Sequence, residues 1–385
     1  MMLSLILARR GVPVTLLEAH HDFDRDFRGD TIHPSTLEII DQLGLADRLH
    51  EIPHGKMHAL TLFTSEGATQ VASLQGLRTR FPYMMLLPQV RFLAFLAEEA
   101  RRFPAFHLEM GARVESIVEE DGRVKGVRFR RGDAEGQEVR ADVVVGCDGR
   151  FSKLRSLAGF EPIRGAPPMD VLWFRLPRAA RDHGTEGGFY VGGGRFAVVF
   201  DRGSEWQVGF VILKDNFAQL KQQGMEAMQQ GLARLVPWLA DRVTHLTDWK
   251  QTTLLSVESD RLAVWYRPGL LLIGDAAHVM SPVGGVGINL AIQDAVEAAN
   301  VLAPKLLAGR VTTGDLALVQ RRREAPTRVI QAFQAIVQRR LAAPALGDAF
   351  RLPWIARIAS RVPILNRLPG RLVGFGLRRV RIEGI

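Results

Sequence analysis

Cysteine is nearly absent from this chain of 385 residues, which contains one, Cys147. A single cysteine excludes an intrachain disulfide and any metal site built from several cysteines. Because a free cysteine usually behaves as a small hydrophobic residue, we expect Cys147 to be buried. No metal site is predicted.

Long apolar runs are missing as well. No segment approaches the roughly 18 residues that would cross a bilayer, so no transmembrane helix is expected. The apolar residues 1–7 precede Arg9 and Arg10, whereas a secretory signal places its positive charges first. We therefore expect a helix in this region and a cytoplasmic location.

The charge balance is basic, with a formal net charge of +9 and a pI near 10.2. A basic chain can attract nucleic acid, an anionic membrane or anionic small molecules. Basic and aromatic residues are not interleaved as nucleic-acid binding would require, so no nucleic-acid partner is expected. The arginine-rich residues 341–385 could make peripheral contact with a membrane, but we favour a C-terminal helical cover whose arginines reach solvent.

The most informative stretch is residues 270–302, LLLIGDAAHVMSPVGGVGINLAIQDAVEAANVL. It begins as an apolar run typical of a buried strand, breaks at a Gly-Asp pair, and passes through a glycine-rich loop into a helix. The spacing of the apolar residues predicts that one face of this helix packs and the other is polar. Gly284, Gly285 and Gly287 would let a ligand approach backbone N–H groups at the positive end of the helix dipole. An ordinary strand–turn–helix junction is the alternative.

The first residues also carry a pattern. A helix over residues 1–11 feeds a strand over 12–17 that is closed by Glu18. This order is typical of the second half of a βαβ dinucleotide unit, so Glu18 is predicted to bind a ribose, with an exposed strand-end glutamate as the alternative. The opening strand and its G-x-G-x-x-G turn are expected before this helix. We therefore expect either a sequence that starts late or a relative that lacks diphosphate binding.

A third segment, ADVVVGCDGRFSKLR at residues 141–155, is an apolar strand followed by an Asp-Gly pair and a helix. Asp148 is expected to orient the segment by hydrogen bonding, and Gly149 to allow a close backbone approach. Arg155 is expected to offer charge to a phosphate. Taken alone, this would be a weak Asp-Gly turn.

Together these segments resemble the group A FAD-dependent aromatic hydroxylases, the para-hydroxybenzoate hydroxylase-like monooxygenases. The match is nearly continuous from Gly274 to Asp294 and covers the rest of the chain more loosely. The resemblance implies that Asp275 contacts ribityl or ribose hydroxyls and that Pro282 lies near the isoalloxazine ring. It also implies that the turn into the helix faces the pyrimidine side of that ring through Gly284, Gly285, Gly287, Ile288 and Asn289.

The resemblance adds further cofactor positions. Arg28 and Gln89 match residues that reach FAD, although a surface position in a first helical turn is nearly as well supported for Gln89. The Asp148-Gly149 pair is similar to a motif implicated in both FAD and NAD(P)H binding. For His33 a structural hydrogen bond is favoured over a place in the site.

The resemblance further implies an α/β fold with three parts. These are a Rossmann-like FAD-binding domain of parallel sheet and helices (1–160 and 268–310), an antiparallel β-rich substrate domain (161–267, with parts of 56–87), and a C-terminal helical segment (311–385). The implied activity is hydroxylation of an aromatic or polyketide-like small molecule with NAD(P)H and O2. No residue identifies itself as catalytic; His183, His245 and Tyr266 are candidates for a general base. A related flavin reductase or halogenase, and a member that no longer binds FAD, are the alternatives.

Overall fold

The computed structural model describes residues 1–24, 31–132, 136–182, 187–339 and 363–384. Arg28 and His183 lie outside these ranges, so their predicted roles remain predictions. The helices are α1 (Met2–Arg9), α2 (Pro34–Gln42), α3 (Ala46–His50), α4 (Gln89–Ala100), α5 (Lys153–Leu157), α6 (Phe217–Gln223), α7 (Met225–Leu235), α8 (Gly287–Leu307), α9 (Thr313–Val337) and α12 (Pro363–Phe375).

The strands are short and numerous. They are β1 (Val14–Glu18), β2 (Thr31–Ile32), β3 (Gly55–Met57), β4 (Ala59–Thr64), β5 (Gly67–Ser73), β6 (Met84–Leu86), β7 (Phe106–Met110), β8 (Ala112–Glu120), β9 (Arg123–Arg131), β10 (Gln137–Arg140), β11 (Val144–Gly146), β12 (Ile163–Arg164), β13 (Met169–Pro177), β14 (Gly187–Gly192), β15 (Arg195–Asp201), β16 (Glu205–Leu213), β17 (Thr253–Leu255), β18 (Asp260–Arg261), β19 (Tyr266–Arg267) and β20 (Leu270–Leu272). Single 3₁₀ turns connect several of them, including η2 (Pro237–Leu239), η3 (Val243–His245), η5 (Gly274–Ala276) and η6 (Val283–Gly285).

The parallel strands form two short sheets. β1 pairs in parallel with β7, and β11 pairs in parallel with β20, whose other edge carries the antiparallel β19. Among the described residues, no strand joins β1 to β11. The residues of β20 are all buried, whereas those of β1 are half-buried or exposed. The predicted mixture of parallel strands, helices and a separate antiparallel sheet is confirmed, with the parallel part divided in two.

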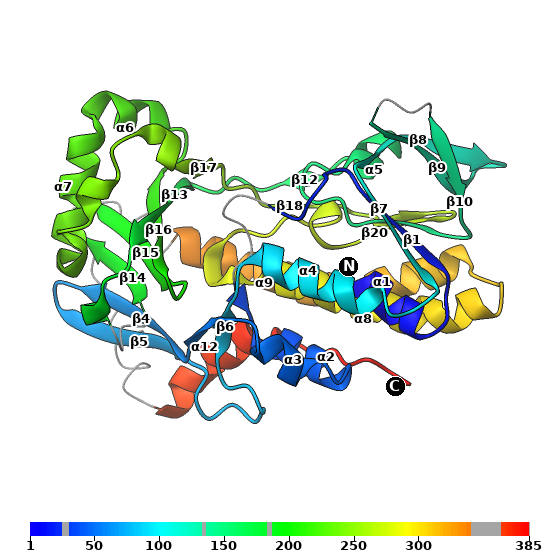
Figure 1. Ribbon diagram of the computed structural model, residues 1–385, viewed down its shortest axis with the longest axis horizontal. Helices are drawn as coiled ribbons and strands as arrows, with labels where there is room; N and C mark the ends of the chain where they lie inside the picture. The colour runs from blue at the N-terminus through cyan, green and yellow to red at the C-terminus, as the bar shows by residue number, and fades with distance from the viewer. Residues whose placement is uncertain (25–30, 133–135, 183–186, 340–362, 385) are drawn as a thin grey trace.

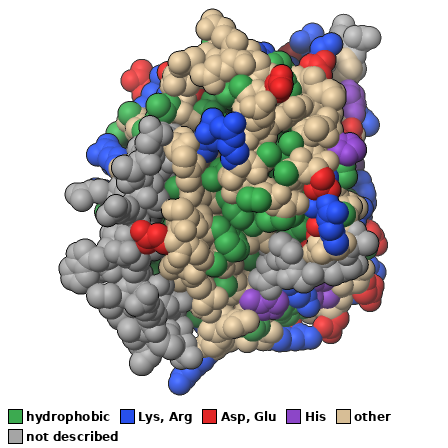
Figure 2. Space-filling model, turned by 90° about the vertical axis from the view of Figure 1, so that its left-hand side faces the viewer, with side chains coloured by type: hydrophobic (Ala, Val, Ile, Leu, Met, Phe, Trp, Pro, Cys, Tyr) green, Lys and Arg blue, Asp and Glu red, His purple; other side chains and the backbone are tan. Residues whose placement is uncertain are grey.

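The antiparallel part is a seven-stranded sheet in the order β17-β13-β16-β15-β14-β4-β5. Only the β14–β4 contact is parallel, where the strands of residues 59–73 join those of residues 169–255. One face packs against α7, η2 and η3 through a core that includes Phe174, Trp206 and Leu232. Figure 1 shows this sheet and its helices at one end of the molecule, away from the parallel strands. On the outer side of that end, hydrophobic side chains gather near the middle and most charged ones lie towards the edges (Figure 2).

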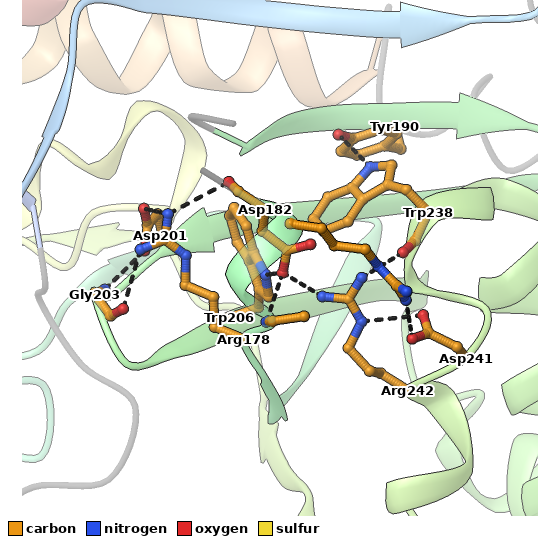
Figure 3. A network of polar contacts seen from close by, with 11 residues as sticks. Arg178, Asp182, Tyr190, Asp201, Gly203, Trp206, Trp238, Asp241 and Arg242 are labelled. Atoms are coloured by element: carbon orange, nitrogen blue, oxygen red, sulfur yellow. Dashed lines mark hydrogen bonds and ion pairs between the residues drawn. The ribbon is translucent and has the colours of Figure 1, made fainter. Parts of the chain in front are cut away.

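A buried polar network ties β16 of this sheet to the residue that precedes η3. Asp182 accepts hydrogen bonds from Trp206 Nε1 at 2.8 Å and from the backbone N–H of Ala179 at 2.9 Å, and it is paired with Arg242. Arg242 also donates to the Trp238 carbonyl oxygen at 2.6 Å, and Figure 3 shows its guanidinium beside Asp182. Both members of the pair are nearly inaccessible to solvent, so the pair is part of the core.

Helix α8 runs through the centre of the molecule (Figure 1). The face predicted to be polar does carry polar residues, but it is buried like the packing face, because Asn289, Leu290 and every residue from 292 to 303 are buried. The reason is packing on several sides, since α1 and α9 both contact α8. Its polar residues are bonded within the protein: Glu297 to Arg322 at 3.0 Å, and Asn300 Nδ2 to the Arg381 carbonyl oxygen at 2.8 Å.

The described C-terminal residues cover the molecule, as the favoured prediction had it. Helix α12 packs against β5 and α2. Val380 and Ile382 are buried in the same core as α1 and α8, and Arg10 donates to the carbonyl oxygen of Glu383. Within the described ranges, no helix is both long and apolar enough to span a membrane.

Candidate functional site

Two of the predicted Asp-containing turns follow neighbouring strands. The register pairs Val144 with Leu270 and Gly146 with Leu272, and the Ile273 N–H donates to the Gly146 carbonyl oxygen at 3.0 Å. The carboxyl ends of parallel strands lie at one edge of a sheet. The turns that carry Asp148 and Asp275 are therefore brought together, as the sequence motifs require.

The turn after β20 needs glycine at its first position. Gly274 has a φ of +60°, and a Cβ there would lie 2.9 Å from Cβ of Ala291 on α8. The Gly274 carbonyl oxygen accepts hydrogen bonds from the N–H groups of Ala277 at 2.9 Å and His278 at 2.8 Å, which closes the turn. Asp275 is half-buried in this turn. Its side-chain position is thus set by a backbone that is pressed against α8.

The glycine-rich loop fits a flat, electron-rich ligand. Gly284 and Gly285 have left-handed φ values of +79° and +62°. A Cβ on Gly284 would meet only Val286 at 3.6 Å, and one on Gly287 only Met280 at 3.8 Å, so the backbone is uncovered at these two positions. At Gly285, in contrast, a Cβ would lie 2.5 Å from Oγ1 of Thr31. No described side chain caps the N-terminus of α8, whose first N–H groups lack partners within the helix. Pro282 and Ile288 are half-buried beside this loop.

Asn289 differs from the other predicted cofactor residues because its side chain is used inside the protein. Its Oδ1 accepts from the His33 N–H at 2.9 Å and from Thr36 Oγ1 at 2.8 Å. Its Nδ2 donates to the carbonyl oxygens of Thr31 and Gly285, both at 3.2 Å. Only the backbone of Asn289 is left for a cofactor, and the side chain holds β2 and α2 against the loop.

His33 has the structural hydrogen bond that the sequence reading favoured. It is fully buried, and its Nδ1 lies 2.7 Å from the Val373 carbonyl oxygen. Burial lowers the pKa of His33 to about 4, so the ring is uncharged at neutral pH. It anchors α12 to the segment that leads into α2.

Asp148 does orient its segment by hydrogen bonding. Its two carboxylate oxygens accept from Ser152 Oγ at 2.5 Å and from the Leu154 N–H at 3.0 Å, which holds the start of α5. Gly149 has a φ of +80° and no atom within 4 Å of the position of a Cβ, so its backbone is approachable. Arg155 is turned inwards, 3.6 Å from Asp260, and its predicted contact with a phosphate stays a prediction.

Two further predictions concern the ends of the parallel strands, and a third concerns the start of α4. Cys147 is exposed, so its predicted burial is wrong; it lies just past the end of β11, where the chain leaves the sheet. Glu18 is the last residue of β1 and accepts hydrogen bonds from the N–H and Nδ1 of His20 at 2.9 and 2.8 Å. Burial lowers the pKa of the Met1 amino group, while Cys147 and Glu18 raise it, so these three groups lie close enough to interact.

Gln89 is half-buried at the start of α4, three residues after β6.

The sequence reading missed the part that α9 plays. Gln334 Nε2 donates to the carbonyl oxygens of Ser281 at 2.8 Å and Val283 at 2.7 Å. Gln331 Nε2 donates to those of Asp260 at 2.7 Å and Val279 at 3.1 Å, and Gln338 Nε2 to Ser281 Oγ at 2.6 Å. These side chains are buried on one face of the helix. Their spacing of three and four residues was a signal, because amides on the buried face of a helix need partners.

We expect Gln334→Leu to lower the free energy of unfolding by about 2 kcal/mol, because two buried carbonyl oxygens lose their donor. Urea unfolding followed by circular dichroism measures the change. Gln222→Leu, the same substitution on the exposed surface of α6, is the control and should stay within about 0.5 kcal/mol of the parent chain. Equal effects of the two substitutions would contradict the role given to Gln334.

The sequence reading also missed the partners of Asp294. This carboxylate on α8 is fully buried and accepts from the Gly274 N–H at 3.0 Å. His278 Nε2 lies 2.6 Å away, and Arg323 Nε of α9 lies 2.7 Å away. All three side chains occur in or near the glycine-rich stretch and α9, but nothing in the local spacing showed that they meet.

An apolar sheet face adjoins the loop. Met169, Val171, Val211 and Val257 form a small buried cluster on the seven-stranded sheet. Val283 of the glycine-rich loop packs against this cluster, as do Trp173 and Phe196. Nε1 of Trp173 is buried with no hydrogen-bond partner in the described structure. The loop thus lies between the start of α8 and a sheet face that carries aromatic rings.

Known proteins resemble this chain in both sequence and fold. A family model described as "FAD binding domain" matches residues 1–332. The 6-methylpretetramide 4-monooxygenase of Streptomyces rimosus is 33% identical over 384 residues, which cover 99% of this chain and 91% of that protein. The rifampicin monooxygenase of Streptomyces venezuelae is 29% identical over 309 residues, covering 77% of this chain and 60% of that protein. A solved structure of a probable FAD-dependent monooxygenase from Pseudomonas aeruginosa has a TM-score of 0.76 at 20% identity, covering 90% of this chain and 96% of that one.

Proposed function

Because this chain belongs to the FAD-binding domain family and is a flavin-dependent monooxygenase, we propose that it hydroxylates an aromatic, polyketide-like small molecule with NAD(P)H and O2. The family membership confirms FAD as the cofactor and the monooxygenase class predicted from the motifs. The alternatives of a flavin reductase or halogenase have less support, because the relative that is 33% identical is a monooxygenase. A cytoplasmic location is part of the proposal.

The observation that carries the substrate proposal is the position of the glycine-rich loop. Val283 packs against the same cluster as Trp173 and Phe196, so the loop that would hold the flavin adjoins an apolar, aromatic sheet face. Apolar and aromatic linings with a few polar groups are typical of small-molecule sites. The relatives named for 6-methylpretetramide and rifampicin support a polyketide-like ligand. Residues 161–267, with parts of 56–87, would form the substrate domain.

The residues present fit FAD at its sugar and ring. Asp275 would accept hydrogen bonds from the ribityl or ribose hydroxyls, and Pro282 would lie near the ring. The backbone of Gly284 and Gly287 is uncovered. It would face the electron-rich edge of the ring together with Gly285 and the N–H groups that begin α8 at Ile288 and Asn289. Bound FAD supplies hydride acceptance from NAD(P)H and activation of O2. The protein supplies orientation and an apolar pocket.

Other residues would complete the cofactor site. Glu18 would bind the adenosine ribose at the end of β1. Gly274 and Gly149 would let backbone approach the cofactor, with Asp148 holding the second of these turns. Gln89, at the start of α4, and Arg28 would reach the flavin side. The FAD-binding domain would span residues 1–160 and 268–310, and residues 311–385 would form the C-terminal helical segment.

The test begins with the visible spectrum of the purified chain after incubation with FAD and gel filtration. We expect flavin absorbance to co-elute with the protein, and Asp275→Ala to weaken FAD binding about tenfold, because a charge-assisted hydrogen bond is lost. Next, NADPH and NADH consumption is measured with a panel of phenols and polycyclic phenolic polyketides. A product heavier by one oxygen atom identifies the substrate class. A folded, colourless chain after incubation would defeat the enzyme proposal.

A further inference from the structure

The turn that carries Asp275 is held from behind by one buried carboxylate. Asp294 Oδ2 accepts from the Gly274 N–H at 3.0 Å and lies 2.6 Å from His278 Nε2. Gly274 begins the turn and His278 follows its end. One carboxylate oxygen therefore bonds both sides of the segment that displays Asp275.

The other oxygen of Asp294 fixes the carboxylate itself. Oδ1 accepts from Arg323 Nε at 2.7 Å, so α8, α9 and the turn meet at this point. Asp294 is fully buried, and only 1% of the side chains of His278 and Arg323 is exposed. Burial would raise the pKa of Asp294, but His278 and Arg323 outweigh it and hold the pKa below its usual value. The carboxylate is ionised at neutral pH, and both of its oxygens have hydrogen-bond partners.

Backbone hydrogen bonds also support the turn, including one from the Leu262 N–H to the Ala277 carbonyl oxygen at 2.8 Å. The His278 ring lies against Trp265, with centroids 4.8 Å apart. Gly274 is pressed against Ala291, one helical turn before Asp294. A buried charge pair is weak evidence for stability, because desolvation opposes the attraction. Its geometric effect is clearer, since the carboxylate sets where the backbone of Gly274 can lie.

We propose that Asp294, clamped by Arg323 and His278, is a positioning residue that holds the Gly274–His278 turn so that Asp275 meets the sugar hydroxyls of FAD. This inference rests on the proposed role of Asp275 in cofactor binding. It predicts that loosening Asp294 changes cofactor affinity and the mobility of the turn together, more than it changes stability elsewhere.

The experiment compares Asp294→Asn with Asp182→Asn. The second variant is a matched control, because Asp182 is also a buried carboxylate paired with a buried arginine, yet it lies in the network of Figure 3 outside the proposed site. Flavin-free protein is studied by hydrogen–deuterium exchange of peptides covering residues 270–282. FAD affinity is then titrated by quenching of flavin fluorescence.

We expect Asp294→Asn to raise the exchange rate across residues 274–278 about tenfold and the Kd for FAD by about tenfold or more. Asp182→Asn should leave both within about twofold while lowering the unfolding midpoint. Should Asp294→Asn alter neither quantity more than Asp182→Asn does, the positioning role is overturned.

A second pair of variants covers the case in which Asp294→Asn does not fold. His278→Gln keeps a donor near the position of Nε2, whereas His278→Leu removes it. For His278→Gln we expect FAD affinity and exchange close to those of the parent chain. For His278→Leu we expect FAD affinity to fall, and the exchange rate of residues 274–278 to rise, by at least fivefold. Indistinguishable variants would contradict the proposal.

Failure of the proposed function gives a different pattern. If the parent chain does not bind FAD, the titration is flat for every variant, including Asp182→Asn. The exchange of residues 274–278 in the flavin-free chain still reports on positioning. A turn that exchanges as slowly in Asp294→Asn as in the parent chain overturns this inference by itself.

Discussion

Replacing Gly274 by valine is expected to abolish FAD retention and to lower the free energy of unfolding by about 3 kcal/mol. A β-branched residue at a φ of +60° is strained by roughly 1–2 kcal/mol or more. Its Cβ would also lie 2.9 Å from Cβ of Ala291, so the turn or α8 has to shift. Urea unfolding gives the stability, and flavin absorbance after gel filtration gives the retention.

Gly44→Val separates backbone strain from the clash. Gly44 has a φ of +71°, but no atom lies within 4 Å of the position of a Cβ. This control should lose about 1–2 kcal/mol of stability and still retain FAD. If Gly274→Val retains FAD, the turn after β20 can move without loss of the cofactor, and its proposed role in FAD binding is contradicted.

Arg242→Met is expected to cost about 3–5 kcal/mol at neutral pH, because it leaves the Asp182 carboxylate buried without its partner. Asp182 is 4% exposed, and the remaining donors are Trp206 Nε1 and the Ala179 N–H. Arg178 also lies nearby and donates to the Asp182 carbonyl oxygen at 3.4 Å. These neutral donors and a more distant guanidinium offset only part of the lost ion pair.

The cost should also depend on pH. Burial would raise the pKa of Asp182, but the bonds from Arg242, Trp206 and Ala179 outweigh it and hold the pKa at about 2, against an ordinary 3.8. A depressed folded pKa gives the parent chain about 2 kcal/mol that is present above pH 4 and lost as the pH falls towards 2. In Arg242→Met burial dominates, so protonation becomes favourable and the gap between the two chains should narrow between pH 6 and pH 3.

Urea unfolding of both chains at several pH values measures this gap. Arg181→Met is the control, because Arg181 pairs with Asp241 at an exposed position and should be worth less than about 1 kcal/mol. A constant difference between Arg242→Met and the parent chain across pH 3–6 would falsify the assignment of the low pKa to Arg242.

Local motifs predicted the parts of the site that depend on neighbouring residues. The motifs singled out Gly274, Gly284 and Gly285, and all three have left-handed φ values that favour glycine. The strand, turn and helix of residues 270–302 occur in the predicted order. Asp148 holds its own turn, as expected from its place between a strand and a helix. Each of these features depends mainly on residues within about ten positions of it in the sequence.

The features that sequence reading missed depend on distant segments. Sequence reading separated a polar from a packing face of α8 but did not show that both are buried. The partners of the polar side chains are distant: Arg322, Arg323 and Arg381, in α9 and beyond α12. Cys147 was expected to be buried because a free cysteine usually behaves as a small hydrophobic residue, but the burial of a strand end depends on which strands lie beside it. The spacing of apolar and polar residues predicts which face of a helix is apolar, but it does not predict how many other elements pack against the helix.

The docking of residues 380–383 against α1 and α8 has a consequence for biosynthesis. Val380 and Ile382 share a core with Met2 and Leu5, so contacts between residues more than 370 positions apart complete it. Contacts of such high sequence separation form late, because a long loop has to close first. While the ribosome is still translating the preceding residues, the part of this core that Val380 and Ile382 cover remains exposed. Nascent chains of this protein should therefore depend on chaperones until residue 382 has emerged.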